Sequence, residues 1–179
     1  MTLRRWKQTD SRTVIKTGYW DYKLDRFIRD GDNYEGEYHY VHTPGSTMII
    51  PVTGNGKLLL VNQFRYLNRR ESLEFPCGSI HEGLNETDNA LKELREETGF
   101  SASDIRKTGE FSPYTGASDE MCSVFIARGL VHSPLPMDKT EEFELVELSP
   151  AELSALIERN IIWDGLTLSA WALANKYFL

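Results

Sequence analysis

Cysteine is scarce in this chain, and long apolar runs are absent. The 179 residues include two cysteines, Cys77 and Cys122, which lie far apart and form no Cys-x-x-Cys pattern. Neither a disulfide framework nor a zinc site is indicated, and a reducing cytoplasm is the expected compartment. Polar residues rather than an apolar signal core follow the basic first residues, and no apolar run reaches membrane-spanning length. We therefore expect neither secretion nor membrane insertion.

Basic residues are fewer than acidic ones, and the formal net charge is -7 at pH 7. Neutralising a nucleic-acid backbone usually requires a basic face, so we expect no general nucleic-acid binding. A small anion held by metal ions is compatible with this charge. With 40% hydrophobic and 26% charged residues, the chain has enough apolar surface to fold. No repeat or linker divides it, so we expect one domain over residues 1–179.

Alternating and capped segments predict a mixture of strands and helices. Trp20, Tyr22 and Leu24 alternate with charged residues, which is the pattern of a strand with one buried face. Further strands are expected at 38–42, 48–52, 57–64, 122–127 and 143–148, and helices at 86–98, 150–159 and 166–177. Gly54-Asn55-Gly56 predicts a hairpin between the strands at 48–52 and 57–64. The irregular connections favour an α+β fold, an α/β/α sandwich with a mixed sheet between helices.

The helix expected at 86–98 is the most informative segment. Asn85 is placed to cap its start and Gly99 to end it. Glu93, Glu96 and Glu97 project from roughly one side of this helix, where like charges repel one another. A hard cation between the carboxylates would remove that repulsion, so a magnesium site would explain the cluster. A solvated, charged helix face is the alternative interpretation.

The segment that ends in this helix resembles the Nudix box, which runs from a glycine through Glu to Arg-Glu-hydrophobic-x-Glu-Glu-x-Gly-hydrophobic. The positions in register are Gly78, Glu93, Leu94, Glu96, Glu97, Gly99 and Phe100. The resemblance implies a Nudix fold and hydrolysis of a pyrophosphate with Mg²⁺, or with Mn²⁺, held by the three glutamates. Leu84 replaces the family's first Glu and Lys92 its Arg, which removes an ion pair that braces the loop against the helix.

The resemblance extends over most of the chain to one branch of that family, the ADP-ribose and nucleotide-sugar pyrophosphatases. It is carried by residues 58–66, with their Gln-x-Arg-Tyr end, and by residues 71–78. This likeness implies that Arg65 holds a phosphate through two charge-assisted hydrogen bonds, with Glu74 as part of the substrate site. Cys77 takes the usual alanine position, so its backbone carbonyl would contribute to a metal. A surface arginine and a buried thiol are the alternative interpretations of Arg65 and Cys77.

Two acidic segments are expected to supply the general base. Residues 112–120 are similar to the branch's Ser-Pro-Gly-x-Ser-Asp-Glu loop, in which Thr115 replaces the proline that marks ADP-ribose preference. Residues 138–145 resemble the acidic loop that carries a further catalytic or metal-binding carboxylate, with Glu141 as the best match. Glu120 and Glu142 are substitutes, and Glu96 of the helix is a further catalytic candidate. A plain solvated loop is the alternative for each loop residue.

The N-terminal strand region, residues 1–43, is aromatic. In the resembled branch, N-terminal strands often reach across a dimer, so we expect a homodimer. Trp20 or Tyr22 would stack on a nucleobase, with core packing as the alternative. The resulting hypothesis is a cytoplasmic hydrolase that converts ADP-ribose to AMP and ribose 5-phosphate. One alternative is a pyrophosphatase for another nucleotide sugar such as GDP-mannose, and another is a catalytically weak nucleotide-binding module, motivated by Leu84 and Lys92.

Overall fold

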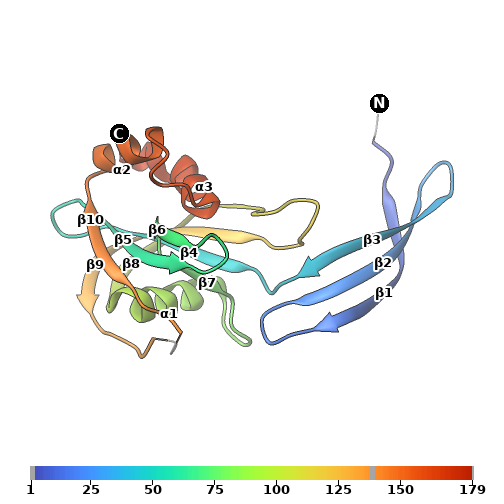
Figure 1. Ribbon diagram of the computed structural model, residues 1–179, viewed down its shortest axis with the longest axis horizontal. Helices are drawn as coiled ribbons and strands as arrows, with labels where there is room; N and C mark the ends of the chain where they lie inside the picture. Colours follow the sequence, from blue (N-terminus) through green and yellow to red (C-terminus); the bar gives the residue numbers. More distant parts are fainter. Residues whose placement is uncertain (1–2, 138–139, 179) are drawn as a thin grey trace. The chain divides into compact units, whose positions relative to one another are not determined.

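The computed structural model describes residues 3–137 and 140–178. These residues fall into two units. Figure 1 shows the chain coloured by residue number. The first unit runs up to Pro44 and takes in Ser112–Glu120, whereas the second comprises Gly45–Phe111 and the chain from Met121 onward.

The first unit is a small antiparallel sheet. Its strands are β1 (Trp6–Lys16), β2 (Asp21–Arg29) and β3 (Tyr34–His42), paired in the order β1-β2-β3. The strands expected at 20–25 and 38–42 fall largely within β2 and β3 and are confirmed. β1 was not expected, because all 11 of its residues are exposed and its sequence carries no alternation between a buried and an exposed face.

Residues 112–120 join this sheet from a distant part of the sequence. Val41 donates its N–H to the carbonyl of Ala117 (2.9 Å), and Asp119 donates its N–H to the carbonyl of Val41 (3.2 Å). The Asp119 carboxylate also lies 2.6 Å from Nδ1 of His42. These contacts tie the loop to the end of β3.

In the described residues, two sheets and three α-helices build the second unit. One sheet has the order β7 (Cys77–Ser79), β4 (Ser46–Pro51), β9 (Cys122–His132), β8 (Phe100–Phe111), with β4 and β9 parallel and the other pairs antiparallel. The other sheet is antiparallel, in the order β10 (Glu144–Leu148), β5 (Leu58–Arg65), β6 (Arg70–Glu74). The helices are α1 (Glu86–Thr98), α2 (Pro150–Glu158) and α3 (Gly165–Ala174), which runs into a short 3-10 turn, η1 (Asn175–Tyr177).

Alternation along β4 explains how helices cover both faces of the second unit. Met48 and Ile50 pack in one hydrophobic core with residues of α2 and α3, whereas Ile49 packs in a second core with Ala90 and Leu94 of α1. Successive side chains of a strand point to opposite faces. Accordingly, α1 lies on one side of the sheets and α2 and α3 lie on the other (Figure 1). The expected α+β fold with a mixed sheet between helices is confirmed.

The expected hairpin between residues 48–52 and 57–64 is wrong. β4 and β5 belong to different sheets, and an isolated bridge from Val52 to Leu58 joins them beside the turn. β4 already pairs with β7 and β9, and β5 with β10 and β6, so neither strand has a free edge for the other. The turn itself forms, with the Thr53 N–H donating to the carbonyl of Lys57 (2.8 Å).

The expected boundaries of α1 and β10 agree with the structure. Asn85 accepts a hydrogen bond from the N–H of Asp88 (2.9 Å), and Gly99 ends α1 at φ +77°. The helix expected at 166–177 is α3 followed by η1. β8 was not expected from the sequence, because it is an edge strand with many polar residues. Among the described helices, none is long and apolar enough to cross a membrane.

A buried hydrogen bond anchors α3 to the chain just after β6. Phe75 donates its N–H to Oγ1 of Thr167 (3.2 Å), and both residues are buried. We predict that Thr167→Val lowers the free energy of unfolding in urea by about 1–3 kcal/mol, because a buried donor loses its partner while the side-chain shape is kept. Thr13→Val on exposed β1 is the matched control and should leave the unfolding midpoint near that of the wild type. Equal midpoints for the two variants would contradict this role.

Candidate active site

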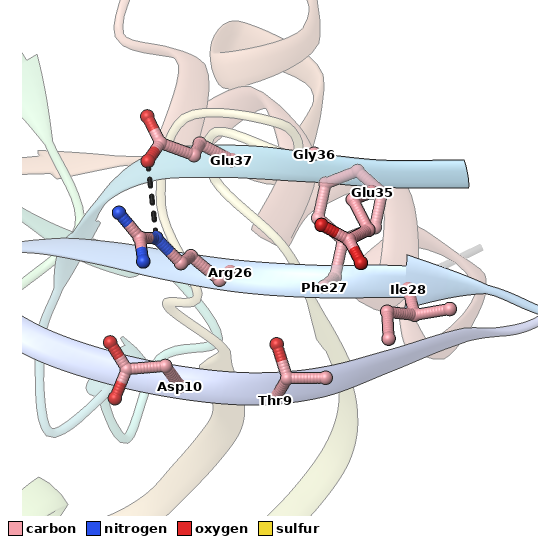
Figure 2. Close-up of a pocket in the computed structure, with 8 residues that line it drawn as sticks. All are labelled: Thr9, Asp10, Arg26, Phe27, Ile28, Glu35, Gly36 and Glu37. Atoms are coloured by element: carbon pink, nitrogen blue, oxygen red, sulfur yellow. Dashed lines mark hydrogen bonds and ion pairs between the residues drawn. The ribbon is translucent and has the colours of Figure 1, made fainter. Parts of the chain in front are cut away.

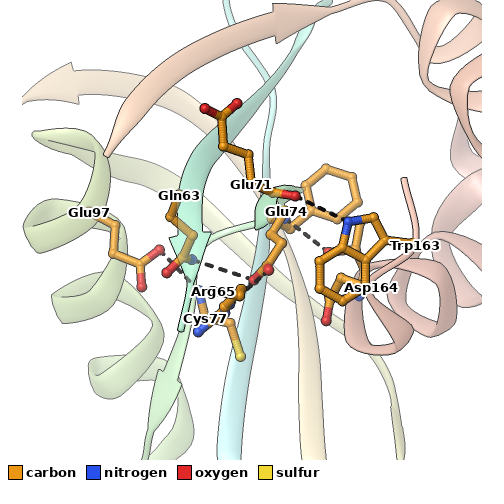
Figure 3. A network of polar contacts seen from close by, with 10 residues as sticks. Gln63, Arg65, Glu71, Glu74, Cys77, Glu97, Trp163 and Asp164 are labelled. Atoms are coloured by element: carbon orange, nitrogen blue, oxygen red, sulfur yellow. Dashed lines mark hydrogen bonds and ion pairs between the residues drawn. The ribbon is translucent and has the colours of Figure 1, made fainter. Parts of the chain in front are cut away.

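Two glutamates of α1 lie against the backbone of β7. The Oε2 atom of Glu97 accepts a hydrogen bond from the N–H of Cys77 (3.3 Å; Figure 3). The carboxyl of Glu93 approaches Gly78 so closely that a methyl group on Gly78 would meet Glu93 Oε2 at 2.2 Å. Glycine at this position therefore lets the carboxylate close onto the strand. Glu93 and Glu97 are each 7% exposed.

Burial makes these two carboxylates hard to ionise. Desolvation raises the pKa of Glu93 to about 7, an effect that Lys92 opposes and that Glu96 and Glu141 reinforce. Burial also raises the pKa of Glu97 well above its ordinary value, and the charges of Glu93 and Glu141 add to that effect. Neighbouring buried carboxylates cost free energy unless a cation compensates them.

The donor atoms suit a hard divalent cation. Glu93 Oε1 is buried and accepts no hydrogen bond within the described part of the chain; His81 Nε2 lies 3.4 Å and Lys92 Nζ 3.7 Å away. A buried polar atom without a partner calls for an explanation, and carboxylate oxygens are the ligands that Mg²⁺ prefers. Residues 3–137 and 140–178 nevertheless hold no group of three His, Cys, Asp or Glu side chains gathered as a finished metal cage. Glu93 and Glu97 come together, whereas Glu96 accepts a hydrogen bond from Lys92 Nζ.

The loop before α1 is held by a residue that the sequence analysis missed. Asn89 is 0% exposed; its Oδ1 accepts from the N–H of His81 (3.0 Å), and its Nδ2 donates to Oγ1 of Thr47 on β4 (2.9 Å). This amide joins the loop, the helix and the sheet through neutral hydrogen bonds. An asparagine next to Ala90 on the apolar side of α1 is the signal that could have indicated it.

Arg65 and Glu74 form a forked ion pair close to Glu97 (Figure 3). Arg65 donates from Nε to Glu74 Oε1 (2.8 Å) and from Nη2 to Oε2, and Gln63 donates to the same Oε2 (3.4 Å). The side chain of Glu74 is 1% exposed and that of Arg65 is 41% exposed. Glu74 therefore lies beneath the guanidinium and orients it, while the guanidinium itself reaches solvent. The charge of Arg65 lowers the pKa of Glu97 against the effect of burial.

Comparison with known proteins assigns the chain to a family. The NUDIX domain model matches residues 42–168, which include the glycine, the loop and the carboxylate helix. The chain belongs to the Nudix family. It is 29% identical over 167 residues to an ADP-ribose pyrophosphatase of Bacillus subtilis, with 90% of each chain covered. It is also 30% identical over 132 residues to a methanol dehydrogenase activator of Bacillus methanolicus, covering 73% of this chain and 71% of the relative.

A solved structure supports the Nudix fold. The crystal structure of an ADP compounds hydrolase matches with a TM-score of 0.85 at 20% identity, covering 99% of this chain and 96% of that chain. The family expected from the Nudix box is confirmed by the domain match, and the similarity to the Bacillus subtilis ADP-ribose pyrophosphatase agrees with the branch expected from residues 58–78. The chain is thus a Nudix-type enzyme, and Nudix hydrolases generally use divalent metal ions.

The remaining expected site residues are spread over both units of this Nudix chain. Glu141 is exposed on the segment before β10, and its charge raises the pKa of both Glu93 and Glu97. Trp20, which is 43% exposed, and Glu120, which is half-buried, belong to the first unit. The roles expected for these residues stay predictions. Residues 138 and 139 of the acidic segment lie outside the described residues.

The thiol of Cys77 is part of the Nudix core. Cys77 and Cys122 are free cysteines, and contact with the Cys122 thiol, followed by burial, raises the pKa of the Cys77 thiol well above its ordinary value. A neutral thiol is a poor nucleophile and a poor metal ligand. The sulfur therefore serves packing, and the role expected for the Cys77 carbonyl stays a prediction.

A hollow of about 580 Å³ lies over the sheet of the first unit (Figure 2). Arg26 donates from Nε to Glu37 Oε1 there (3.3 Å), and Asp10 and Glu35 also line the hollow. Three carboxylates beside one arginine repel an anion, so this hollow is a poor place for a diphosphate. It contains none of the site residues expected from the sequence.

We predict that Gly78→Ala weakens Mn²⁺ binding by about ten-fold or more, because a supporting contact of a ligand is lost when the new methyl group displaces the Glu93 carboxylate. The free Mn²⁺ concentration, measured by electron paramagnetic resonance, gives the affinity. Gly54→Ala is the matched control, because a methyl group there would meet no atom within 4 Å, and it should bind as the wild type does. Equal affinities for the two alanine variants would show that Glu93 is not a ligand at this place.

Proposed function

We propose that this Nudix chain is a Mg²⁺-dependent hydrolase of nucleoside diphosphate sugars that converts ADP-ribose to AMP and ribose 5-phosphate. The observation that carries the proposal is the buried pair of Glu93 and Glu97, with an oxygen of Glu93 that accepts no hydrogen bond in the described chain. A simple binder of an anion gains nothing from buried negative charge, whereas an enzyme that loads divalent ions needs it. The similarity to the ADP-ribose pyrophosphatase of Bacillus subtilis supports the substrate.

Glu93 and Glu97 would hold the metal, together with the Cys77 carbonyl and Glu96. All four groups offer hard oxygen atoms, which suit Mg²⁺ and also Mn²⁺. When bound, the divalent ion neutralises charge on the diphosphate and lowers the pKa of water. The Cys77 N–H and the bare backbone of Gly78 keep the two buried carboxylates in place for this task.

Glu141 is the proposed general base. It accepts the proton of the attacking water as the water oxygen bonds to phosphorus and the bond from that phosphorus to the bridging oxygen breaks. Two observations support this role: Glu141 is exposed, and its charge acts on both Glu93 and Glu97. Glu120 and Glu96 are the substitutes for the same role.

Arg65 is proposed to contact a phosphate of the substrate, with Glu74 as its positioning residue. Within residues 3–137 and 140–178, Arg65 donates to Glu74 through Nε and Nη2, so Nη1 is left for a phosphate oxygen. Trp20 is proposed to stack on the nucleobase through its exposed ring. Tyr22 is the substitute, although its hydroxyl already lies 2.9 Å from Nδ1 of His39.

Another nucleotide sugar, such as GDP-mannose, is the second candidate substrate. It is favoured by Thr115, which stands where the resembled loop has a proline. The same carboxylates and the same arginine would serve either substrate, so the two differ in the base and sugar contacts alone. A weak nucleotide-binding module would keep the fold and turn over neither compound.

We predict Mg²⁺-dependent phosphate release from ADP-ribose when a phosphatase is added to a panel of nucleoside diphosphate sugars. Glu97→Gln should lower kcat by about 100-fold or more, because several kcal/mol of charge stabilisation depend on the metal. Glu158→Gln, which changes an exposed carboxylate at the end of α2, should keep the wild-type rate.

Three outcomes would change the assignment. Faster turnover of GDP-mannose than of ADP-ribose would move it to the second substrate. If the folded protein releases no phosphate from any compound of the panel, the binding module would be favoured. An unchanged rate in Glu97→Gln would remove the metal site from α1.

We also infer that the enzyme is a homodimer in which residues 1–179 form one Nudix domain and the strands in residues 1–43 meet the partner. The described sheet β1-β2-β3 buries Leu24, while Trp6, Val14, Ile15 and Tyr34 remain about half exposed. Three strands with so little buried apolar surface are marginal by themselves. A second copy of the chain would cover the exposed side chains.

The molar mass in solution tests the dimer. Size-exclusion chromatography with light scattering should give twice the 20.5 kDa of one chain for the wild type. Ile15→Lys should shift the mass toward that of one chain, because it puts a charge into the apolar surface that the partner would cover. Val131→Lys, at a similarly exposed apolar residue of β9, is the control and should stay dimeric. A wild-type protein with the mass of one chain at micromolar concentration would refute the dimer.

A further inference from the structure

The ammonium of Lys92 lies close to the side chains of Glu93, Glu96 and His81. Nζ donates to Oε2 of Glu96 (2.5 Å), and it lies 3.0 Å from Nε2 of His81 and 3.7 Å from Oε1 of Glu93. The side chain of Lys92 is 28% exposed. The lysine thus reaches into the acidic cluster rather than out into solvent.

The contact between Lys92 and Glu93 is incomplete. An N–H···O hydrogen bond is about 2.7–3.2 Å long, so an ammonium farther away leaves Glu93 Oε1 without a hydrogen bond. A single ammonium also offers one positive charge to the carboxylates of Glu93 and Glu96.

Helix stability by itself does not explain this placement. Lys92 precedes Glu96 by four residues, and that order is less stabilising in a helix than Glu before Lys. On the loop, Leu84 stands where a carboxylate would pair with a cation at position 92, and a leucine offers no such partner. The ammonium has instead turned to the carboxylates of its own helix.

We propose that Lys92 is an internal cation that occupies the metal site of α1 and that a divalent ion must displace. The proposal rests on the metal site of the proposed function and is independent of the substrate. As the ion enters, Nζ leaves Glu93 and Glu96, because two cations repel each other and these carboxylates bind the divalent ion more strongly. The contacts that Lys92 gives up reduce the net affinity of the protein for the metal.

Direct measurement of Mn²⁺ binding to the full chain tests this displacement without an enzyme assay. Lys92→Met keeps the length of the side chain and removes its charge, so it should bind Mn²⁺ about ten-fold more tightly than the wild type or better. Arg95→Met removes a charge from the same helix. The Nε atom of Arg95 donates to the carbonyl of Ser133 (2.8 Å), outside the cluster. Lys107→Met removes a lysine that lies 2.8 Å from Glu86 and 3.0 Å from Glu110 on another face. Both controls should bind as the wild type does.

The reactivity of Lys92 provides a second readout. If Mg²⁺ releases Nζ to solvent, an amine-specific reagent should modify Lys92 faster once Mg²⁺ is added, and mass spectrometry of the wild-type protein measures that rate. Lys107 is the internal control, since its rate should not change. A slower or constant rate at Lys92 would overturn the displacement.

The binding data separate this proposal from the proposed function. Equal Mn²⁺ affinities for Lys92→Met and the wild type, in a protein whose binding is lost in Glu97→Gln, would overturn the displacement and keep the metal site. Equal tightening in Arg95→Met would also overturn it, because a general charge effect would then suffice. Absence of Mn²⁺ binding in the wild type and in folded Lys92→Met alike would overturn both proposals. Lys92→Gln replaces Lys92→Met if circular dichroism shows that the methionine variant does not fold.

Discussion

The desolvation of Glu93 and Glu97 against the backbone of β7 is the constraint on which the rest of the site depends. The apolar side of α1 packs on the sheet, with Ala90 and Leu94 in one core with Ile49 of β4. This packing leaves Glu93 and Glu97 facing β7. Bare backbone at Gly78 and the Cys77 N–H are then needed to receive the two carboxylates. The same packing that buries the two carboxylates makes their charge costly unless a cation compensates it.

The two departures from the Nudix box, Leu84 and Lys92, change how the loop and the helix are connected without undoing the site. The buried amide of Asn89 fastens the loop to both α1 and β4 through neutral hydrogen bonds. Lys92 contacts the carboxylate of Glu96 on its own helix and the ring of His81 on the loop. The charged contacts of position 92 thus differ from the ion pair that the Nudix box pattern implies.

The two units differ in what stabilises them. The second unit buries every residue of β4 between cores on both faces, and the candidate site residues Glu93, Glu97, Arg65 and Glu74 all belong to this unit. The first unit depends on pairing between strands, with little buried apolar surface of its own. The candidate site residues of the second unit thus lie on a well-packed scaffold, whereas the first unit keeps apolar side chains exposed.

Local interactions explain what the sequence by itself determined. The limits of α1, its cap at Asn85, its stop at Gly99 and the spacing of its glutamates depend on residues within one or two turns of the helix. The neighbours of β4 and β5, the burial of Glu74 under Arg65, and the roles of Asn89 and Lys92 were decided by the tertiary structure. Strand pairing depends on which edges distant segments leave free, and the environment of a polar side chain depends on which segments fold over it. Neither of these is written in the spacing of nearby residues.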